Sequence, residues 1–312
     1  MPISEAEALS FPGPWKIPAV LFYERTDREA PAASESPKDQ DADILCHDMS
    51  ISAHRDPELI RHSVLTPDEI PSKGDLVAID SEFVALNQEE LELRSDGSRR
   101  LIRPSRLTLA RVSVLRGQGP KEGEAFVDDY IRTREKDCRL PHPVLGHRNG
   151  DLDPATSKHT LVPLKVAYKK LRVLVDRGCV FVGHGLSKDF RIINIHVPPS
   201  QVIDTVDLYH SSTHPRKLSL RFLAWFLLKQ DIQGPSNMAE GHDSIQDALA
   251  ALKLYRLYQQ FERENRLDDV LEDCTRRAKF TGGSPPRRPL VNDGPFVNDC
   301  IRHSSCGDGL YS

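Results

Sequence analysis

The sequence predicts an α/β protein in which α-helices flank a mixed β-sheet on both faces. Two observations predict this class. Of the 312 residues, 38% are hydrophobic and 28% are charged, a balance typical of folded globular domains. Three β-rich runs come first, and helical and strand patterns then alternate along the chain.

The first elements expected are a strand at Trp15–Tyr23 and a flexible linker from Glu24 to Asp43, which is rich in Asp, Glu, Ser and Pro. Short apolar, β-branched runs then predict strands at Leu76–Leu86, Leu109–Leu115 and Ala125–Ile131. These three strands come before any strongly helical pattern.

The second half alternates helical and strand patterns. Apolar residues at helical spacing predict a helix over 161–174, and the next stretch, Cys179–Val182, is an apolar strand. The elements expected after it are a helix at Leu186–Ile195, a strand at Gln201–Leu208, and helices at Lys217–Leu228 and Asp243–Glu264. The remainder, from Ala278, is expected to be a disordered tail.

Composition also limits the location and the kind of partner. The net charge of −4 excludes a globally basic nucleic-acid coat and leaves only local basic patches. The six cysteines include no C-x-x-C pair, so neither a zinc site nor a dense disulfide framework is predicted. The longest apolar run, Leu218–Leu228, is too short for a bilayer span. We therefore expect a cytoplasmic protein that does not contact membranes.

Two carboxylates stand on the first strong strand. Side chains alternate along a strand, so Asp80 and Glu82 point to one face while Ser81 points to the other. The flanking residues are apolar, and two buried acids repel each other unless a metal ion or arginines lie opposite. The alternative is an edge-strand pair facing solvent; the apolar flanks favour a metal site.

Three further residues could complete such a site. Asp189 follows an apolar strand and a Gly-His-Gly turn, at the sheet edge where ligands of α/β proteins bind. Asp189 could equally cap its own helix. Ser244 and Asp247 resemble a capping box, which would place His242 just before a helix and Asp247 one turn inside it. That pairing suits a general base beside a metal ligand.

Four acids at one sheet edge can hold two divalent ions that clamp the attacking and leaving oxygens of a phosphodiester. Carboxylate ligands favour Mg²⁺, with Mn²⁺ also suitable, because zinc sites use more histidine or cysteine. The spacing of His242 and Asp247 is weak evidence alone, since His184 and Asp189 have the same spacing.

Taken together, Asp80, Glu82, Asp189, His242 and Asp247 resemble the signature of the DEDDh exonuclease family. Longer strings, such as GDLVAIDSEFVALNQEE and FVGHGLSKDFRIIN, resemble the branch that forms the catalytic subunits of poly(A)-nuclease deadenylation complexes. The resemblance implies a ribonuclease H-like fold and two-metal 3′-to-5′ hydrolysis of poly(A) tails that releases AMP.

The same resemblance implies a role for each site residue. Asp80, Glu82, Asp189 and Asp247 would be metal ligands, His242 would be the general base, and His184 would be structural. The implied partners are poly(A) RNA, a regulatory pseudokinase-like subunit and, indirectly, poly(A)-binding protein.

The implied domain order places a remnant of an inactive ubiquitin-hydrolase-like domain at 1–25, a linker at 26–64, the exonuclease domain at 65–278 and a disordered tail at 279–312. The chain thus resembles a C-terminal fragment or a truncated gene model.

Two segments depart from the family pattern. Cys138–His147 reads like a frameshifted version of a helix-forming stretch, and PSNMAE between Gly234 and Gly241 is an insertion directly before His242. Both departures keep open the alternative of a non-catalytic remnant that binds RNA or protein. A DNA-trimming exonuclease of the same fold is the second alternative.

Two other patterns have simpler interpretations. Seven arginines between Arg94 and Arg116 could follow a phosphate backbone, but a solvated hairpin surface is the favoured interpretation. The apolar and aromatic residues from Leu218 to Phe226 are expected to be helix core.

Overall fold

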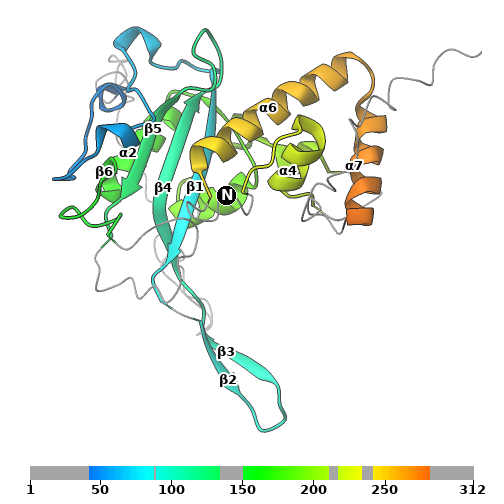
Figure 1. Ribbon diagram of the computed structural model, residues 1–312, viewed down its shortest axis with the longest axis horizontal. Helices are drawn as coiled ribbons and strands as arrows, with labels where there is room; N and C mark the ends of the chain where they lie inside the picture. Colours follow the sequence, from blue (N-terminus) through cyan, green and yellow to red (C-terminus); the bar gives the residue numbers. More distant parts are fainter. Residues whose placement is uncertain (1–41, 88, 134–149, 211–216, 234–241, 282–312) are drawn as a thin grey trace, which may run out of the picture. The chain divides into compact units, whose positions relative to one another are not determined.

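The computed structural model describes residues 42–87, 89–133, 150–210, 217–233 and 242–281 (Figure 1). These residues all belong to one structural unit. The strand expected at Trp15–Tyr23, the segment Cys138–His147 and the insertion before His242 lie outside the described residues.

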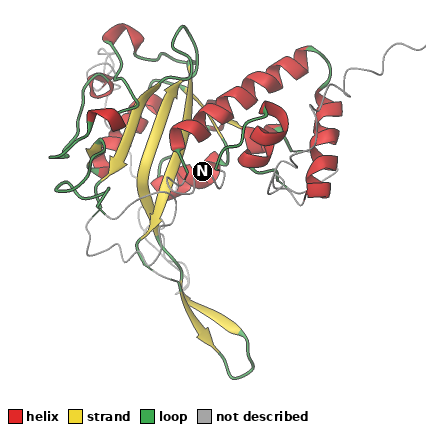
Figure 2. Ribbon diagram, viewed as in Figure 1, coloured by secondary structure: helices red, strands yellow, loops and turns green. Residues whose placement is uncertain are grey.

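A six-stranded sheet forms the centre of this unit (Figure 2). Its order is β6-β5-β4-β1-β7-β8; β1 pairs antiparallel with β4 and β4 with β5, whereas the other neighbours are parallel. The mixed sheet predicted from sequence is confirmed. Its strands are β1 (Leu76–Ala85), β4 (Leu107–Arg116), β5 (Ala125–Ile131), β6 (Leu161–Val162), β7 (Val180–Gly183) and β8 (Val202–Asp204).

Helices cover both faces of the sheet. On one face, α2 (Leu164–Asp176) and α3 (Leu186–Ile193) bury Leu171, Leu174 and Phe190 against Val77 and Ile79 of β1. On the other face, α6 (Ser244–Arg263) packs Ala248 and Leu252 against Ala78, which lies between Val77 and Ile79 on β1. Alternate residues of β1 therefore contact different helices, so the parity of a β1 residue decides which layer its side chain enters.

A second core forms where α6 meets the C-terminal helices. Phe222 and Leu223 are fully buried there with Leu254 and Cys274. The helices are α4 (Thr205–Leu208), α5 (Leu220–Leu223), the π-helix η5 (Ala224–Leu228) and α7 (Leu267–Thr281). The expectation that Leu218–Phe226 is core holds for Leu218, Leu220, Phe222 and Leu223, whereas Trp225 and Phe226 are half-buried.

Several elements differ from the expectations. The strand expected at Gln201–Leu208 ends at Asp204, because the Asp204 side chain accepts a hydrogen bond from the Val206 N–H and starts α4. The tail is expected to begin at Ala278, but α7 continues to Thr281. Cys274 and Ala278 of this helix are buried in the second core.

The predicted linker also differs, because Ala42 and Leu45 are buried in the main core and residues 42–64 pack on the domain. This segment carries the short helices η1 (Ala42–Leu45) and η2 (Pro57–Leu59); η3 (Pro67–Glu69) and η4 (Pro199–Gln201) lie elsewhere.

A hairpin projects from the end of β1 and β4 (Figure 1). It consists of β2 (Glu90–Leu93) and β3 (Arg99–Arg103), two strands that the sequence did not predict. All its strand residues are exposed. Five of the seven arginines lie in or beside it, whereas Arg111 and Arg116 are buried in β4. The arginines therefore do not form one surface.

None of the helices in the described ranges has the length and apolar character that a bilayer crossing requires.

Candidate active site

The two carboxylates of β1 lie on the α6 face of the sheet. Asp80 and Glu82 have the same parity as Ala78, which packs against α6. On β4 they pair with Ser113 and Arg111 respectively. The Glu82 side chain is 5% exposed, so it is buried among apolar neighbours as the sequence predicted.

The start of α6 brings the next carboxylate to this face. Asp243 is the N-cap residue, and its side chain accepts a hydrogen bond from the Ile245 N–H. The capping box expected from Ser244 and Asp247 is therefore wrong: the helix begins at Ser244 with Asp243 as its cap. Asp247 still lies one turn into the helix, where its side chain is 3% exposed.

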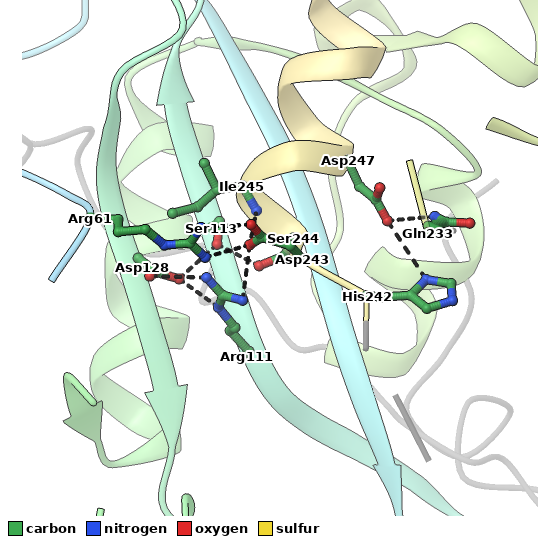
Figure 3. Close-up of polar contacts among 10 residues, drawn as sticks. All are labelled: Arg61, Arg111, Ser113, Asp128, Gln233, His242, Asp243, Ser244, Ile245 and Asp247. Carbon is green, nitrogen blue, oxygen red and sulfur yellow. Dashed lines mark hydrogen bonds and ion pairs between the residues drawn. The ribbon is translucent and has the colours of Figure 1, made fainter. Parts of the chain in front are cut away.

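His242 and Gln233 converge on the Asp247 carboxylate (Figure 3). The Nδ1 atom of His242 lies 3.7 Å from Asp247 Oδ2, and the Gln233 amide donates a hydrogen bond of 2.6 Å to the same oxygen. The other oxygen, Oδ1, is buried with no hydrogen-bond partner among the described residues. A buried carboxylate oxygen without a partner is energetically costly, and a cation would satisfy it.

Asp189 approaches from the opposite layer, on the first turn of α3. Gly183 allows this close approach, because a Cβ there would lie 2.4 Å from Leu186 and 2.8 Å from the Ile79 carbonyl oxygen. The helix N-terminus is already capped, since Asp204 accepts hydrogen bonds from the N–H groups of Gly185 and Leu186. Asp204 rather than Asp189 therefore accepts the hydrogen bonds at the start of α3, and the Asp189 carboxylate remains available to the site.

His184 has a separate environment. Its Nδ1 lies 2.8 Å from the Thr205 hydroxyl, which donates to the Gly183 carbonyl oxygen, and this contact ties the turn after β7 to α4.

The carboxylates raise each other's pKa. Burial raises the pKa of Asp80 well above its usual value, and the charges of Asp247, Glu82 and Asp189 raise it further. Burial raises the pKa of Glu82 to about 7 and that of Asp189 to about 7. The pKa of His242 is also raised, because its side chain contacts the Asp247 carboxylate. Burial and the neighbouring negative charges therefore disfavour the ionised form of these carboxylates when no cation is bound.

This donor set fits divalent metal ions. Glu82, His242 and Asp247 each offer a ligand atom, and the three atoms lie within 4.8 Å of one another. Asp80 stands on the same face of β1 as Glu82, and Asp189 lies on the first turn of α3. The structure thus brings Glu82, His242 and Asp247 together, and the mainly carboxylate character of the five residues that the sequence singled out suits oxygen-preferring ions such as Mg²⁺.

A network of polar side chains beside the cluster fixes the start of α6 (Figure 3). Arg111 donates to both oxygens of Asp128, at 2.7 and 3.1 Å, and its Nη1 lies 3.2 Å from Asp243. Arg61 forms two hydrogen bonds of 2.8 Å with the same Asp243 carboxylate. The Ser113 and Ser244 hydroxyls lie 2.6 Å apart in the interior. Asp243, which adjoins His242, is therefore held by two guanidinium groups.

Sequence reasoning did not identify Arg61, Gln233, Asp243 or Asp128 as parts of the site. The only available signal was parity: Arg111 and Ser113 of β4 lie opposite Glu82 and Asp80 once the register of the two strands is known. Arg61 and Gln233 carry no such signal, since they reach the site from irregular segments.

The fold and this cluster match a known family. The family model described as Exonuclease (RNase_T) matches residues 77–255, and the chain belongs to this family. With its mixed sheet between helices, the domain has the ribonuclease H-like fold of solved Pan2 nuclease structures.

The chain is 54% identical over 288 residues to the PAN2-PAN3 deadenylation complex catalytic subunit PAN2 of Cryptococcus neoformans var. neoformans serotype D, covering 91% of this chain and 24% of that protein. It is 50% identical over 302 residues to the corresponding subunit of Schizosaccharomyces pombe, covering 96% of this chain and 27% of that protein.

Among solved structures, the Saccharomyces cerevisiae Pan2 pseudoubiquitin hydrolase-RNA exonuclease module in complex with AAGGAA RNA matches with a TM-score of 0.67 and 38% identity, covering 78% of this chain and 37% of that one. The resemblance inferred from sequence motifs is confirmed. The chain spans about a quarter of the length of the curated relatives.

Proposed function

We propose that this chain is a 3′-to-5′ exoribonuclease that shortens poly(A) RNA and releases AMP. The observation that carries the proposal is the group of carboxylates around Glu82 and Asp247, which are both buried and offer ligand atoms within 4.8 Å of each other and of His242. Such a group needs cations to be stable in its ionised form at neutral pH. The relatives named as deadenylase subunits and the RNA-bound structure support RNA as the substrate.

In this proposal Asp80, Glu82, Asp189 and Asp247 hold two divalent ions, Mg²⁺ or Mn²⁺. When bound, such ions stabilise the negative charge that develops on the attacking and leaving oxygens of the phosphodiester. The protein supplies a dry, acidic floor under the scissile phosphate, since Glu82 and Asp247 are both buried.

His242 is the proposed general base. Its side chain is 39% exposed at the rim of the cluster, so a water molecule and the RNA end can reach it. Nδ1 faces Asp247, which leaves Nε2 to take the proton from the attacking water. Asp243, held by Arg61 and Arg111, fixes the residue next to His242 and so limits the movement of the base.

We further propose that the chain acts in the cytoplasm, with a regulatory subunit of the PAN3 type as partner and poly(A)-binding protein as an indirect one. The printed name of the relatives, the PAN2-PAN3 deadenylation complex, supports this assignment. Residues 1–25 are proposed to be a remnant of the inactive hydrolase-like domain that precedes the nuclease domain.

The test is hydrolysis of a 5′-labelled A-rich RNA oligonucleotide in Mg²⁺ and in EDTA. We expect metal-dependent release of AMP from the 3′ end. Asp80→Ala should abolish it, whereas Asp176→Ala, an exposed acid that pairs with Arg172 on α2, should leave it unchanged. His242→Ala should lower kcat while metal binding, measured by calorimetry, persists. Folded protein that binds RNA without turnover would favour the non-catalytic alternative, and faster cleavage of DNA would favour a DNA-trimming enzyme.

A further inference from the structure

A second concave site lies outside the acidic cluster, between η5 and α7. This cavity of about 700 Å³, here called the α7 pocket, is lined by Trp225, Phe226, Lys229, Asp273, Arg276, Arg277 and Phe280. Its volume is in the range of sites that bind small molecules or single residues of a polymer. All of its α7 residues lie beyond the exonuclease family match, which ends at residue 255.

The α7 pocket carries a net positive charge. Three cations line it against one acid, and that acid, Asp273, is paired with Arg276. The Nε atom of Arg277 is buried and makes no hydrogen bond within the described ranges. An anionic ligand would instead pair with the cationic side chains that line the pocket.

Aromatic rings accompany these cations. The Arg277 guanidinium lies 5.8 Å from the centre of the Trp225 ring, and the Lys229 ammonium lies 5.2 Å from that of Phe226. The Phe280 side chain is 87% exposed, so its ring is accessible to a ligand of the pocket. Aromatic rings beside cations are the combination that binds single-stranded nucleic acid, with bases stacked on rings and phosphates paired with basic groups.

The chain connection places this pocket near the acidic cluster. Lys229 is four residues from Gln233, whose amide donates to Asp247. Four residues span at most about 14 Å between Cα atoms even when fully extended. One wall of the pocket therefore lies within a distance of the cluster that a strand of RNA several nucleotides long can span.

We propose that the α7 pocket binds a nucleotide of the single-stranded RNA upstream of the scissile phosphate. Its base stacks on Trp225 or Phe280, and its phosphate pairs with Arg277. This inference rests on the proposed function and extends it, because the nuclease would grip its substrate at two points. A poly(A) tail too short to reach the pocket would then be held only at the acidic cluster.

Tryptophan fluorescence reports directly on this site. The chain has two tryptophans, so Trp15→Phe leaves Trp225 as the only one. Oligo(A) of increasing length is titrated into this variant in EDTA, which prevents turnover. We expect quenching by oligomers long enough to reach the pocket, little quenching by dinucleotides, and none by an abasic phosphodiester of equal length. No quenching at any length would overturn the proposal, as would quenching by an acidic aromatic peptide but not by RNA, which would assign the pocket to a protein partner.

Affinity and turnover separate this proposal from the proposed function. Phe280→Ser and Arg277→Gln should each weaken binding of long oligo(A) by about 5- to 100-fold, the range expected for loss of one stacked base. Phe280 is exposed, so its replacement leaves the fold intact even if Trp225→Ala does not. Arg266→Gln, which removes an equal charge from an exposed ion pair with Glu264, should bind normally.

Hydrolysis of dinucleotides should be unchanged in both pocket variants. If these variants bind and degrade long RNA like the parent, the pocket proposal is wrong while the nuclease proposal stands. If no RNA is hydrolysed but quenching is observed, the nuclease proposal fails and the binding site remains.

Discussion

Replacing Glu82 with glutamine should stabilise the metal-free protein at alkaline pH. Burial raises the pKa of Glu82 from its usual 4.5 to about 7. Because the folded-state pKa lies above the unfolded-state value, the folded state binds more protons between these values, and stability falls as the pH rises through this window. Above pH 7 the ionised Glu82 therefore costs the metal-free protein about 3 kcal/mol.

Glutamine keeps the shape of the side chain and removes the ionisation. We expect the variant in EDTA to exceed the parent by about 2–3 kcal/mol at pH 8 and by less than about 1 kcal/mol at pH 5. The assay is urea unfolding of both proteins at each pH. His62, His159 and His184, whose pKa values burial lowers, oppose the trend below pH 6.5, but they are present in both proteins and cancel in the difference.

Magnesium supplies the matched control. At pH 8 it should stabilise the parent more than the variant, because Glu82 would then be a ligand rather than a repelled charge. A variant equally or less stable than the parent at pH 8 in EDTA would refute the reasoning, since it would show that the ionised Glu82 is already compensated within the protein.

Three further predictions follow from the contacts. Arg61→Ala should lower kcat by about 3- to 10-fold with little change in KM, because it removes two of the hydrogen bonds that hold Asp243 beside the general base; steady-state hydrolysis measures this. Lys170→Ala should destabilise the protein by about 3–5 kcal/mol, because it leaves the buried Asp129 carboxylate, 2.8 Å from the ammonium, without its partner; thermal or urea unfolding measures this. Replacing the hairpin strands and turn, residues 90–103, by a short Gly-Ser link should leave the melting temperature nearly unchanged, because every strand residue is exposed.

Each of these has a discriminating control. Arg61→Lys should restore part of the lost kcat, and an unchanged kcat in Arg61→Ala would show that Arg111 alone fixes Asp243. The double variant Asp129→Leu/Lys170→Met should be more stable than Lys170→Ala, and equal destabilisation would mean that side-chain packing, not the unpaired charge, causes the loss. A large drop in melting temperature on hairpin removal would show that the exposed leucines stabilise the domain.

The sequence by itself determined the fold class and the family, and it predicted the residues of the site. Alternation along a strand put Asp80 and Glu82 on one face, because successive side chains of a strand must point to opposite faces. The apolar runs around them are long enough to indicate a buried strand, and the motifs carried the resemblance. These are local properties, so they can be predicted from neighbouring residues.

Tertiary structure decided what depends on residues far apart in the chain. Asp243 rather than Ser244 caps α6, and it accepts a hydrogen bond from Arg61, which is 182 residues away along the chain. The burial of Ala42, Leu45 and Leu65 in the main core and the packing of α7 required partners that no local pattern identifies. Likewise, Trp225 and Phe280 form one pocket only because η5 and α7 pack together. Contacts of this kind are set by how the layers pack, which the sequence of any one segment does not specify.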